Sequence, residues 1–379
     1  MNDETKGILL TGATGFLGGE VLARLAERES QPIYALVRAP DDRAAQARLG
    51  AVTETLGLNG LAPGRRPVAV AGDIARPGLG LSPQRRRWLA GRTGRIIHCA
   101  ASVSFTLGLE ESRAINVEGT RRMLDLAELC VESAGLDSFL HVSTAYVAGT
   151  AEGRLGESEL QLGQGFRNPY EQSKFEAEVL IRERSGRLPV QVVRPSIVVG
   201  DSRTGWTSSF NVLYAPLRAF IRGAYPAVPA RRSSPVDVVP VDYVADAIVA
   251  LAGRPGEVHH LTASGRASTV GEVIELASEH AGRPAPRVVS PALYRRAIHP
   301  VLVHSGPPSR RRALRRSEVF FPYFAMRTEF DDTKARGALA PLGIQPPPLR
   351  SYFGRLVEYA HAAHWGRGPQ PRRLAAAGA

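Results

Sequence analysis

The chain has 379 residues, 44% of them hydrophobic, and a formal net charge of +12. This length and apolar content allow one large buried core or two modest ones, so we expect a folded globular protein. The arginines are spread along the whole chain, without zinc-finger spacing or an aromatic RNA-binding motif, so no nucleic-acid partner is expected. The charge leaves peripheral contact with a membrane surface open, and composition leaves both a monomer and a homodimer open.

The ends and the cysteines restrict the cellular setting. The segment Met1–Lys6 is polar and partly acidic, unlike a signal peptide, and no apolar run approaches the roughly 18 residues of a membrane span. Two cysteines, Cys99 and Cys130, are too few for a disulfide framework or a multi-cysteine metal site. We therefore expect a cytoplasmic protein without a transmembrane segment or a bound metal.

Up to about residue 200, short apolar runs alternate with longer helical patterns, as in repeated strand–helix units. Several runs are almost continuously apolar, which is typical of parallel strands buried on both faces. Strands are predicted at Gly7–Thr11, Pro32–Val37, Pro67–Ala71, Arg95–Cys99, Ser138–Ser143 and Val190–Arg194. Helices are predicted at Leu17–Glu29 and Val117–Ser133, with a further helix start at Ser82-Pro83. The predicted fold class is α/β, a doubly wound parallel sheet of the Rossmann type.

The pattern changes after residue 200. We predict an NADP-binding Rossmann domain over residues 1–262, in which 201–235 contributes to a substrate cap. A smaller, mainly helical substrate-binding domain is expected over 263–366 and a flexible tail over 367–379. Trp206, Phe210 and Tyr214 recur at four-residue spacing, which fits either helix core or the wall of an acyl channel. The basic cluster at 310–316 fits a solvated helix face or contact with an anionic substrate or carrier.

A glycine-rich turn directly follows the first predicted strand and opens a helix. Glycine lets backbone N–H groups and the positive end of a helix approach a pyrophosphate, because it has no Cβ. The spacing is Gly-x-x-Gly-x-x-Gly, not the Gly-x-Gly-x-x-Gly of many dehydrogenases. We therefore predict a dinucleotide site that includes Thr11, Gly12, Thr14, Gly15, Phe16, Leu17 and Gly18.

The residue after the second strand indicates which dinucleotide binds. An NAD-specific fold usually places an acid there to hold the ribose 2′-hydroxyl, but this chain has Arg38. Because an arginine pairs with a 2′-phosphate, NADPH is the favoured cofactor, although Asp41 and Asp42 lie nearby. Asp73, after the third strand, is placed either to meet the adenine ring or to cap a turn.

The clearest indication of chemistry is a lysine in a chain with only three of them. Lys174 lies four positions after Tyr170, so in a helix both side chains share one face. A nearby ammonium would lower the pKa of the tyrosine. Thr144 follows the fifth strand, at the sheet edge where such folds bind ligands. The plainer alternatives are a loop-capping threonine and a surface pair of Tyr170 and Lys174.

Together these motifs resemble the extended short-chain dehydrogenase/reductases, whose signature joins this glycine turn to a Ser/Thr, a Tyr and a Lys. The resemblance implies a catalytic triad of Thr144, Tyr170 and Lys174, with Thr144 preferred over Ser143 because it precedes Ala145. It also implies that Asn116 supports the lysine through a water. The local pattern alone would make Asn116 a helix cap.

Finer matches resemble one branch, the fatty acyl-CoA reductases and the related thioester reductase domains of carboxylic acid reductases. They lie within residues 7 to 262, at 72–74, 79–82, 98–105, 141–146, 194–198, 205–206 and 237–244. This resemblance adds Ile74, Ala100, Ala101, Ser102, Pro195 and Ile197 to the expected cofactor site.

The resemblance implies an NADPH-dependent oxidoreductase of lipid metabolism. Its substrate would be an acyl thioester on CoA or on an acyl-carrier protein, reduced to an aldehyde, with a further step to the alcohol left open. A nucleotide-sugar epimerase or dehydratase, or a hydroxysteroid-like dehydrogenase, is the alternative on the same fold. A non-catalytic NADPH-binding sensor or scaffold is the alternative from another class, and the intact Thr-Tyr-Lys set disfavours it.

Overall fold

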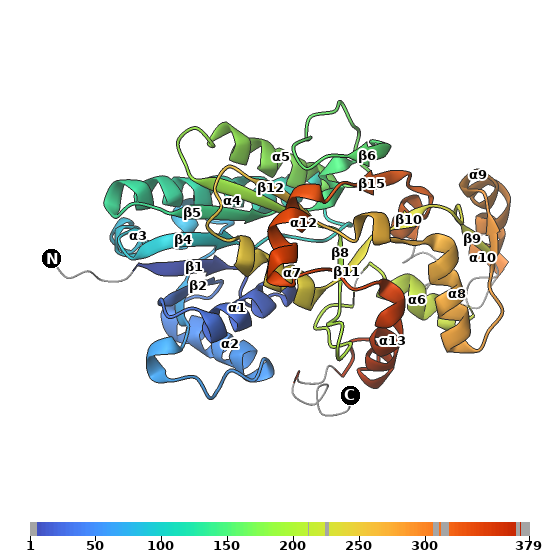
Figure 1. Cartoon of the computed structure of the whole chain (residues 1–379), viewed down its shortest axis with the longest axis horizontal. Helices are drawn as coiled ribbons and strands as arrows, with labels where there is room; N and C mark the ends of the chain where they lie inside the picture. The colour runs from blue at the N-terminus through green and yellow to red at the C-terminus, as the bar shows by residue number, and fades with distance from the viewer. Residues whose placement is uncertain are drawn as a thin grey trace.

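A seven-stranded parallel sheet forms the centre of the computed structural model, which describes residues 6–210, 212–223, 227–305, 311, 318–368 and 372 (Figure 1). The strand order is β12-β7-β5-β4-β1-β2-β3. The strands are β1 (Gly7–Thr11), β2 (Ile33–Val37), β3 (Val68–Ala71), β4 (Thr93–His98), β5 (Ser138–Val142), β7 (Val190–Pro195) and β12 (Val258–Leu261). This arrangement confirms the predicted fold class.

Helices cover both faces of the sheet (Figure 1). One face carries α1 (Phe16–Arg28), α2 (Asp42–Thr55) and α7 (Val241–Leu251), and the other carries α3 (Pro83–Ala90), α4 (Leu109–Ser133) and α5 (Pro169–Glu183). Strand β1 shows why its sequence is continuously apolar. Ile8 and Leu10 belong to the core on the α1 side, whereas Leu9 belongs to the core on the opposite side. Both faces of the strand are buried, as parallel sheets require.

The chain reverses its direction of travel across the sheet between β1 and β4. It first runs outward from β1 through β2 to β3, and then returns to β4 and continues through β5 and β7 to β12. Thr11 at the end of β1 pairs with His98 at the end of β4. The carboxyl ends of these two strands therefore form the topological switch point where doubly wound sheets bind ligands.

A second core lies beyond the carboxyl edge of the sheet. It is built from α6 (Tyr214–Ile221), α8 (Val270–Ala281), α13 (Phe353–Ala362) and the parallel pair β9 (Ala227–Pro229) and β14 (Arg287–Val289). Short strands β10 (Pro235–Val236) and β13 (Ser268–Thr269) pair within it. The remaining helical segments here are α9 (Pro291–Leu293), a π-helical turn (Tyr294–Ile298), α10 (His299–Ser305) and the 3-10 segment η6 (Glu318–Ala325).

Two further pairs of short parallel strands lie outside the seven-stranded sheet. Strand β8 (Ile197–Val199) pairs with β11 (Val238–Pro240), and β15 (Thr328–Phe330) pairs with β6 (Gly153–Leu155). Helix α12 (Thr333–Leu339) returns to the sheet, because Ala335 and Leu339 belong to the same core as α1 and α7. The domain boundary at residue 262 stays a prediction, and most of the predicted tail at 367–379 lies outside the described residues.

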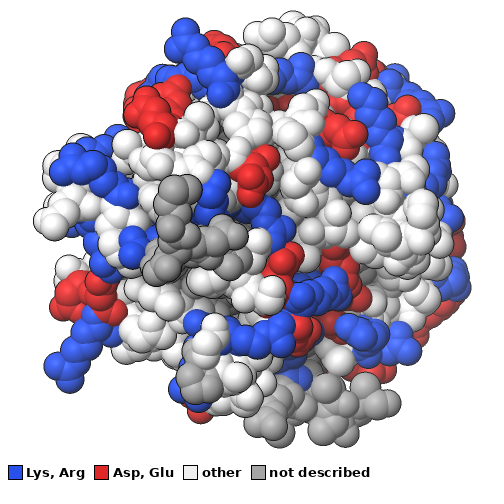
Figure 2. Space-filling view, turned by 60° about the vertical axis from the view of Figure 1, so that its left-hand side comes forward, with Lys and Arg blue, Asp and Glu red and all other residues white. Residues whose placement is uncertain are grey.

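Charge on the visible face in Figure 2 is dispersed, with Lys and Arg interspersed among acidic and uncharged side chains. No helix within the described ranges is both long enough and apolar enough to cross a bilayer.

Candidate active site

The glycine turn leaves the first turn of α1 accessible. Gly12 has φ +76°, and a Cβ there would lie 2.8 Å from the backbone nitrogen of Ala100. A Cβ on Gly18 would collide with the carbonyl oxygen of Gly12. No side chain caps the helix at Gly15, so none competes for its terminal N–H groups. The turn therefore fits the close approach of a pyrophosphate to a helix N-terminus.

A cavity of about 530 Å³ extends from this turn along the carboxyl edge of the sheet. Most of the residues predicted for the site line it: Gly12, Thr14, Gly15, Phe16, Leu17, Gly18, Arg38, Asp73, Ile74, Ala100, Ala101, Thr144, Tyr170, Lys174, Pro195 and Ile197. Three predicted residues, Thr11, Ser102 and Asn116, are not among the lining residues.

Thr11 connects the ends of the two central strands. Its Oγ1 accepts a hydrogen bond from the Ala100 backbone N–H at 3.1 Å and lies 2.7 Å from Nδ1 of His98. These contacts hold the loop after β4 beside the glycine turn.

Asn116 fastens the same loop to α5. Its Oδ1 accepts from the Ser102 backbone N–H at 2.8 Å, and its Nδ2 donates to the Ser102 carbonyl at 3.1 Å and to Oγ of Ser173 at 2.9 Å. The interpretation of Asn116 as a helix cap is wrong, because α4 already begins at Leu109. Asn116 thus reaches the residue adjacent to Lys174.

Two arginines line the cavity near the end of β2 and α2. Arg38 was predicted there, and Arg48 of α2 joins it, with its Nη1 donating to the Arg38 carbonyl at 2.9 Å. Asp41 and Asp42, which could have favoured NAD, are not among the lining residues. Asp41 caps α2, and Asp42 accepts from the Ala71 backbone N–H and pairs with Arg85.

The structure bears out one of the two roles that the sequence left open for Asp73, the stabilisation of a turn, and contact with an adenine ring stays a prediction. Asp73 lines the cavity, and its Oδ1 also accepts from the Ala75 backbone N–H at 2.9 Å, so it stabilises the turn after β3.

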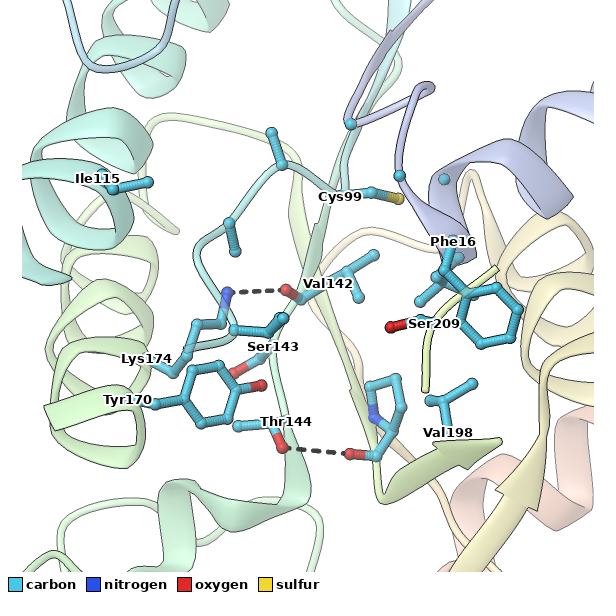
Figure 3. A pocket seen from close by; sticks show the side chains of 18 of the residues that line it. Phe16, Cys99, Ile115, Val142, Ser143, Thr144, Tyr170, Lys174, Val198 and Ser209 are labelled. Carbon is cyan, nitrogen blue, oxygen red and sulfur yellow. Dashed lines mark hydrogen bonds between the residues drawn. The ribbon is translucent and has the colours of Figure 1, made fainter. Parts of the chain in front are cut away.

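Thr144, Tyr170 and Lys174 converge on one part of the cavity (Figure 3). Tyr170 and Lys174 project from the first two turns of α5, which begins with an Asn168 cap, and Thr144 follows β5. Thr144 Oγ1 donates to the Pro195 carbonyl at 3.3 Å, and a side-chain hydrogen bond links it to Tyr170. Ser143 Oγ instead donates to Glu178 at 2.8 Å. Thr144 is therefore the hydroxyl placed beside Tyr170.

Lys174 is almost fully buried, with 2% of its surface exposed. Its Nζ donates to the Val142 carbonyl at 2.9 Å and lies 3.2 Å from Nε2 of His141. Burial lowers its pKa to about 8, and the negative charge of Glu178 counteracts part of that lowering.

The pKa of Tyr170 is raised, whereas the sequence led us to expect that a neighbouring ammonium lowers it. Burial raises the pKa of Tyr170 to about 12, the hydrogen bond to Thr144 lowers it, and the charge of Glu171 raises it further. Desolvation is the largest of these effects, and Lys174 is not among the groups that shift the pKa of Tyr170. At neutral pH the Tyr170 hydroxyl is protonated and serves as a hydrogen-bond donor.

Sequence reasoning missed the aromatic wall beside Tyr170. The Phe105 ring stacks on Tyr170 with centroids 5.5 Å apart and on Tyr323 at 5.7 Å. Tyr323 belongs to η6, and its hydroxyl donates to Oε1 of the buried Glu171 at 2.6 Å. Tyr323 lies 152 positions from Glu171 along the chain, so no local pattern indicates this contact.

A second, mostly apolar cavity of about 110 Å³ adjoins the first. The two cavities share four lining residues, Tyr146, Ile197, Val212 and Tyr323. Beyond them the walls come mainly from α6, α8 and η6, through Leu213, Pro216, Leu217, Phe220, Val270, Val273, Ile274, Ala277, Phe320 and Phe324.

Of the two interpretations of Trp206, Phe210 and Tyr214, internal packing is correct and the acyl-channel wall is not, because none of the three lines either cavity. Phe210 packs between Tyr214 and Tyr359, and Tyr214 is fully buried in the second core. Their spacing reflects internal packing. Of the basic cluster at 310–316, all but Arg311 lies outside the described residues.

The fold and the motifs described above are those of the extended short-chain dehydrogenase/reductases. A family model described as Male sterility protein, an NAD-binding family, matches residues 10–248, more than half of the chain. The chain belongs to this family, and its homologues include fatty acyl-CoA reductases and thioester reductase domains.

Relatives of known name support this assignment. An isonitrile lipopeptide synthase of Streptomyces coeruleorubidus is 35% identical over 277 residues, which are 71% of this chain and 18% of that protein. Fatty acyl-CoA reductase 1 of Rattus norvegicus is 29% identical over 291 residues, 67% of this chain and 55% of that protein. The chain thus matches only part of each of these relatives.

Among solved structures, the terminal R domain from the myxalamid PKS-NRPS biosynthetic pathway has a TM-score of 0.83 and 28% identity, covering 98% of this chain and 94% of that chain. UDP-glucuronic acid 4-epimerase from Bacillus cereus, in complex with NAD, has a TM-score of 0.65 and 17% identity, covering 95% and 98%. The second likeness shows a shared fold alone.

Proposed function

We propose that this protein reduces an acyl thioester to an aldehyde with NADPH. The observation that carries the proposal is the junction of the two cavities. The first cavity meets the apolar one at Tyr146, Ile197, Val212 and Tyr323, and Thr144 and Tyr170 line the first cavity. Thr144 lies next to the junction, because its Oγ1 accepts a hydrogen bond from the Tyr146 backbone N–H at 3.2 Å. An apolar acyl group in the second cavity would bring its carbonyl carbon to these two hydroxyls.

NADPH fits the residues of the first cavity. The Gly12–Gly18 turn suits the pyrophosphate, and Arg38 with Arg48 offers two cations for a 2′-phosphate. The nicotinamide, when bound, supplies the hydride that adds to the thioester carbonyl carbon.

Tyr170 stabilises the negative charge that develops on the carbonyl oxygen, and Thr144 adds a second hydrogen bond when its single O–H turns from the Pro195 carbonyl to that oxygen. A donor is needed there, and the raised pKa of Tyr170 keeps its hydroxyl protonated. The C–S bond then breaks, the aldehyde forms, and the thiolate takes a proton from solvent. The balanced change is one thioester, one NADPH and one proton to one aldehyde, one NADP⁺ and one thiol.

Lys174 and Asn116 would position the cofactor and helix α5. Lys174 would bind the nicotinamide ribose, because its ammonium has three donors and the Val142 carbonyl and His141 account for two contacts. Asn116 would hold α5 next to the loop after β4, through its hydrogen bonds to Ser102 and Ser173.

The thioester carrier is CoA or an acyl-carrier protein. One curated relative is named a fatty acyl-CoA reductase, and a structural neighbour is described as a thiolation-reductase di-domain. Support for the epimerase alternative comes from fold-level likeness to two structures described as a putative epimerase and a UDP-glucuronic acid 4-epimerase, at 18% and 17% identity.

The test is a substrate panel with wild type and Tyr170→Phe. Acyl-CoAs of several lengths, acyl-carrier thioesters, aldehydes and sugar nucleotides are each incubated with NADPH, and products are identified by mass. We expect aldehyde and free thiol from thioesters, with turnover about 100-fold lower in Tyr170→Phe. Conversion of a sugar nucleotide, with no thioester consumed, would replace this proposal by the epimerase alternative.

A further inference from the structure

Helix α5 presents a second buried ionic group one turn beyond Lys174. Glu178 is fully buried, and its carboxylate accepts from Ser143 Oγ at 2.8 Å and from Arg194 Nη2 at 2.5 Å. Nε of Arg194 also lies 3.1 Å from each carboxylate oxygen of Glu178, so two guanidinium nitrogens contact the same carboxylate. Removing one partner of such a buried ion pair is strongly destabilising, because it leaves the other charge buried without compensation.

Both partners of Glu178 adjoin the reacting groups. Ser143 directly precedes Thr144, and Arg194 directly precedes Pro195, whose carbonyl accepts the Thr144 hydroxyl. Lys174 donates to Val142, on the other side of Ser143. Successive turns of α5 therefore hold the end of β5, and Glu178 also holds the end of β7.

The same network continues to the C-terminal segment. Arg194 Nη1 lies 3.1 Å from Nε2 of His260, and Nδ1 of that histidine lies 2.7 Å from the Asp331 carbonyl. The Glu157 carboxylate accepts from the backbone N–H groups of His260, Lys334 and Ala335. The network therefore joins the start of α12 to the strand ends at the site.

Glu178 is also the buried carboxylate beside Lys174. The titratable groups that face the lysine are His98 and Cys99 at the end of β4, His141 on β5, and Tyr170 and Glu178 on α5. The two histidines have lowered pKa values and the cysteine has a raised one, so all three are neutral near pH 7. Glu178 supplies the negative charge that favours the ammonium form.

We propose that Glu178 is a positioning residue of the reaction, which holds Thr144 through Ser143 and Arg194 and keeps Lys174 charged. This inference rests on the proposed function for its turnover readout, but NADPH binding tests it separately. A purely structural role would change stability without moving a pH profile.

The main variant is Glu178→Gln, which keeps the shape of the side chain and removes its charge. Loss of the carboxylate lowers the pKa of Lys174 further, so the ammonium is lost earlier as pH rises. We expect the alkaline limb of NADPH binding, followed by nucleotide fluorescence, to move about one pH unit toward acid, and that of kcat/KM to move with it. Glu183→Gln, at the exposed end of the same helix, is the matched control and should leave both profiles in place.

Two further variants separate charge from geometry. Glu178→Asp keeps the charge, so its alkaline limb should stay near that of wild type while kcat falls. Ser143→Ala keeps the Glu178–Arg194 pair, and we expect kcat to fall about tenfold with little change in thioester KM. Ser143→Ala also serves if Glu178→Gln does not fold.

The outcomes are distinct. A folded Glu178→Gln protein with unchanged pH profiles for NADPH binding and turnover, or an unchanged kcat in Ser143→Ala, would overturn the inference. If wild type reduces no thioester, the proposed function fails, yet a shift of NADPH binding in Glu178→Gln would still support the effect of Glu178 on Lys174.

Discussion

At the scale of single residues, the site depends on a lysine held in a small space. Lys174 makes its two contacts from a position with 2% exposure. A guanidinium is broader and planar, and it cannot place one compact charge at the same point.

We therefore predict that Lys174→Arg, although it keeps the charge, lowers kcat/KM for the thioester at least about 100-fold. Lys334→Arg is the control, because Lys334 is exposed at the start of α12. Steady-state kinetics of both variants gives the comparison. Near-normal turnover in Lys174→Arg would contradict the role assigned to the ammonium.

The paired arginines give a prediction about cofactor choice. Replacing Arg38 and Arg48 by alanine removes both cations near the proposed 2′-phosphate. We expect KM for NADPH to rise at least about tenfold while KM for NADH changes little. Equal losses for the two nucleotides would mean that these arginines do not distinguish them.

Sequence indicated some site residues and not others for physical reasons. Tyr170 and Lys174 share a helix, so four-residue spacing was enough to place them together. Arg48 could have been found from its position in the helix after Arg38. Tyr323 could not, because its contacts with Phe105 and Glu171 come from distant segments.

At the scale of elements, apolar patterning predicted six strands of the sheet, β1 to β5 and β7, to within one or two residues, because helices cover both faces of the sheet. The start of helix α4 was predicted less accurately. The helix begins at Leu109 instead of the predicted Val117, since its first turn is acidic and exposed and Gly108 offers no side-chain cap. The apolar cavity was not predictable, because α6, α8 and η6 each contribute only a few of its lining residues.

Helix α8 provides a test of that cavity. Ala277 is buried and lines it, so Ala277→Phe should fill part of the space. We expect kcat/KM for long acyl thioesters to fall about tenfold or more, with acetyl or butyryl thioesters little affected. Glu279→Phe, on the exposed side of α8, is the control. An equal loss for all chain lengths would argue against an acyl group in this cavity.

At the scale of the whole molecule, buried histidines tie stability to pH. Burial lowers the pKa values of His98 and His260 to about 3 and that of His141 well below its usual value. In the unfolded chain these rings take up protons near pH 6.5, so the unfolded state binds more protons below that pH. Stability should therefore fall as pH drops from about 7, and the raised pKa of Asp237, about 6, offsets part of this in the acid range.

We predict that the melting temperature decreases between pH 7.5 and 5.5. Each such histidine contributes up to about 1.4 kcal/mol per pH unit once pH is below 6.5. His260→Gln should make the decrease shallower, whereas His304→Gln, at an exposed position, should not. Thermal unfolding across this pH range, followed by circular dichroism, tests the prediction. A melting temperature that does not change with pH would contradict the role of the buried histidines.

The proposed reaction transfers a hydride to a thioester carbonyl at the junction of the two cavities. The most direct measurement uses NADPH with both C4 hydrogens of the nicotinamide replaced by deuterium, together with a medium-chain acyl-CoA, with the aldehyde analysed by mass and the free thiol quantified. We expect one deuterium on the aldehyde carbon and one thiol per NADP⁺ formed, and in Tyr170→Phe we expect the same products to form about 100-fold more slowly. Cofactor oxidation without thiol release, or an aldehyde without deuterium, would contradict the proposed reaction.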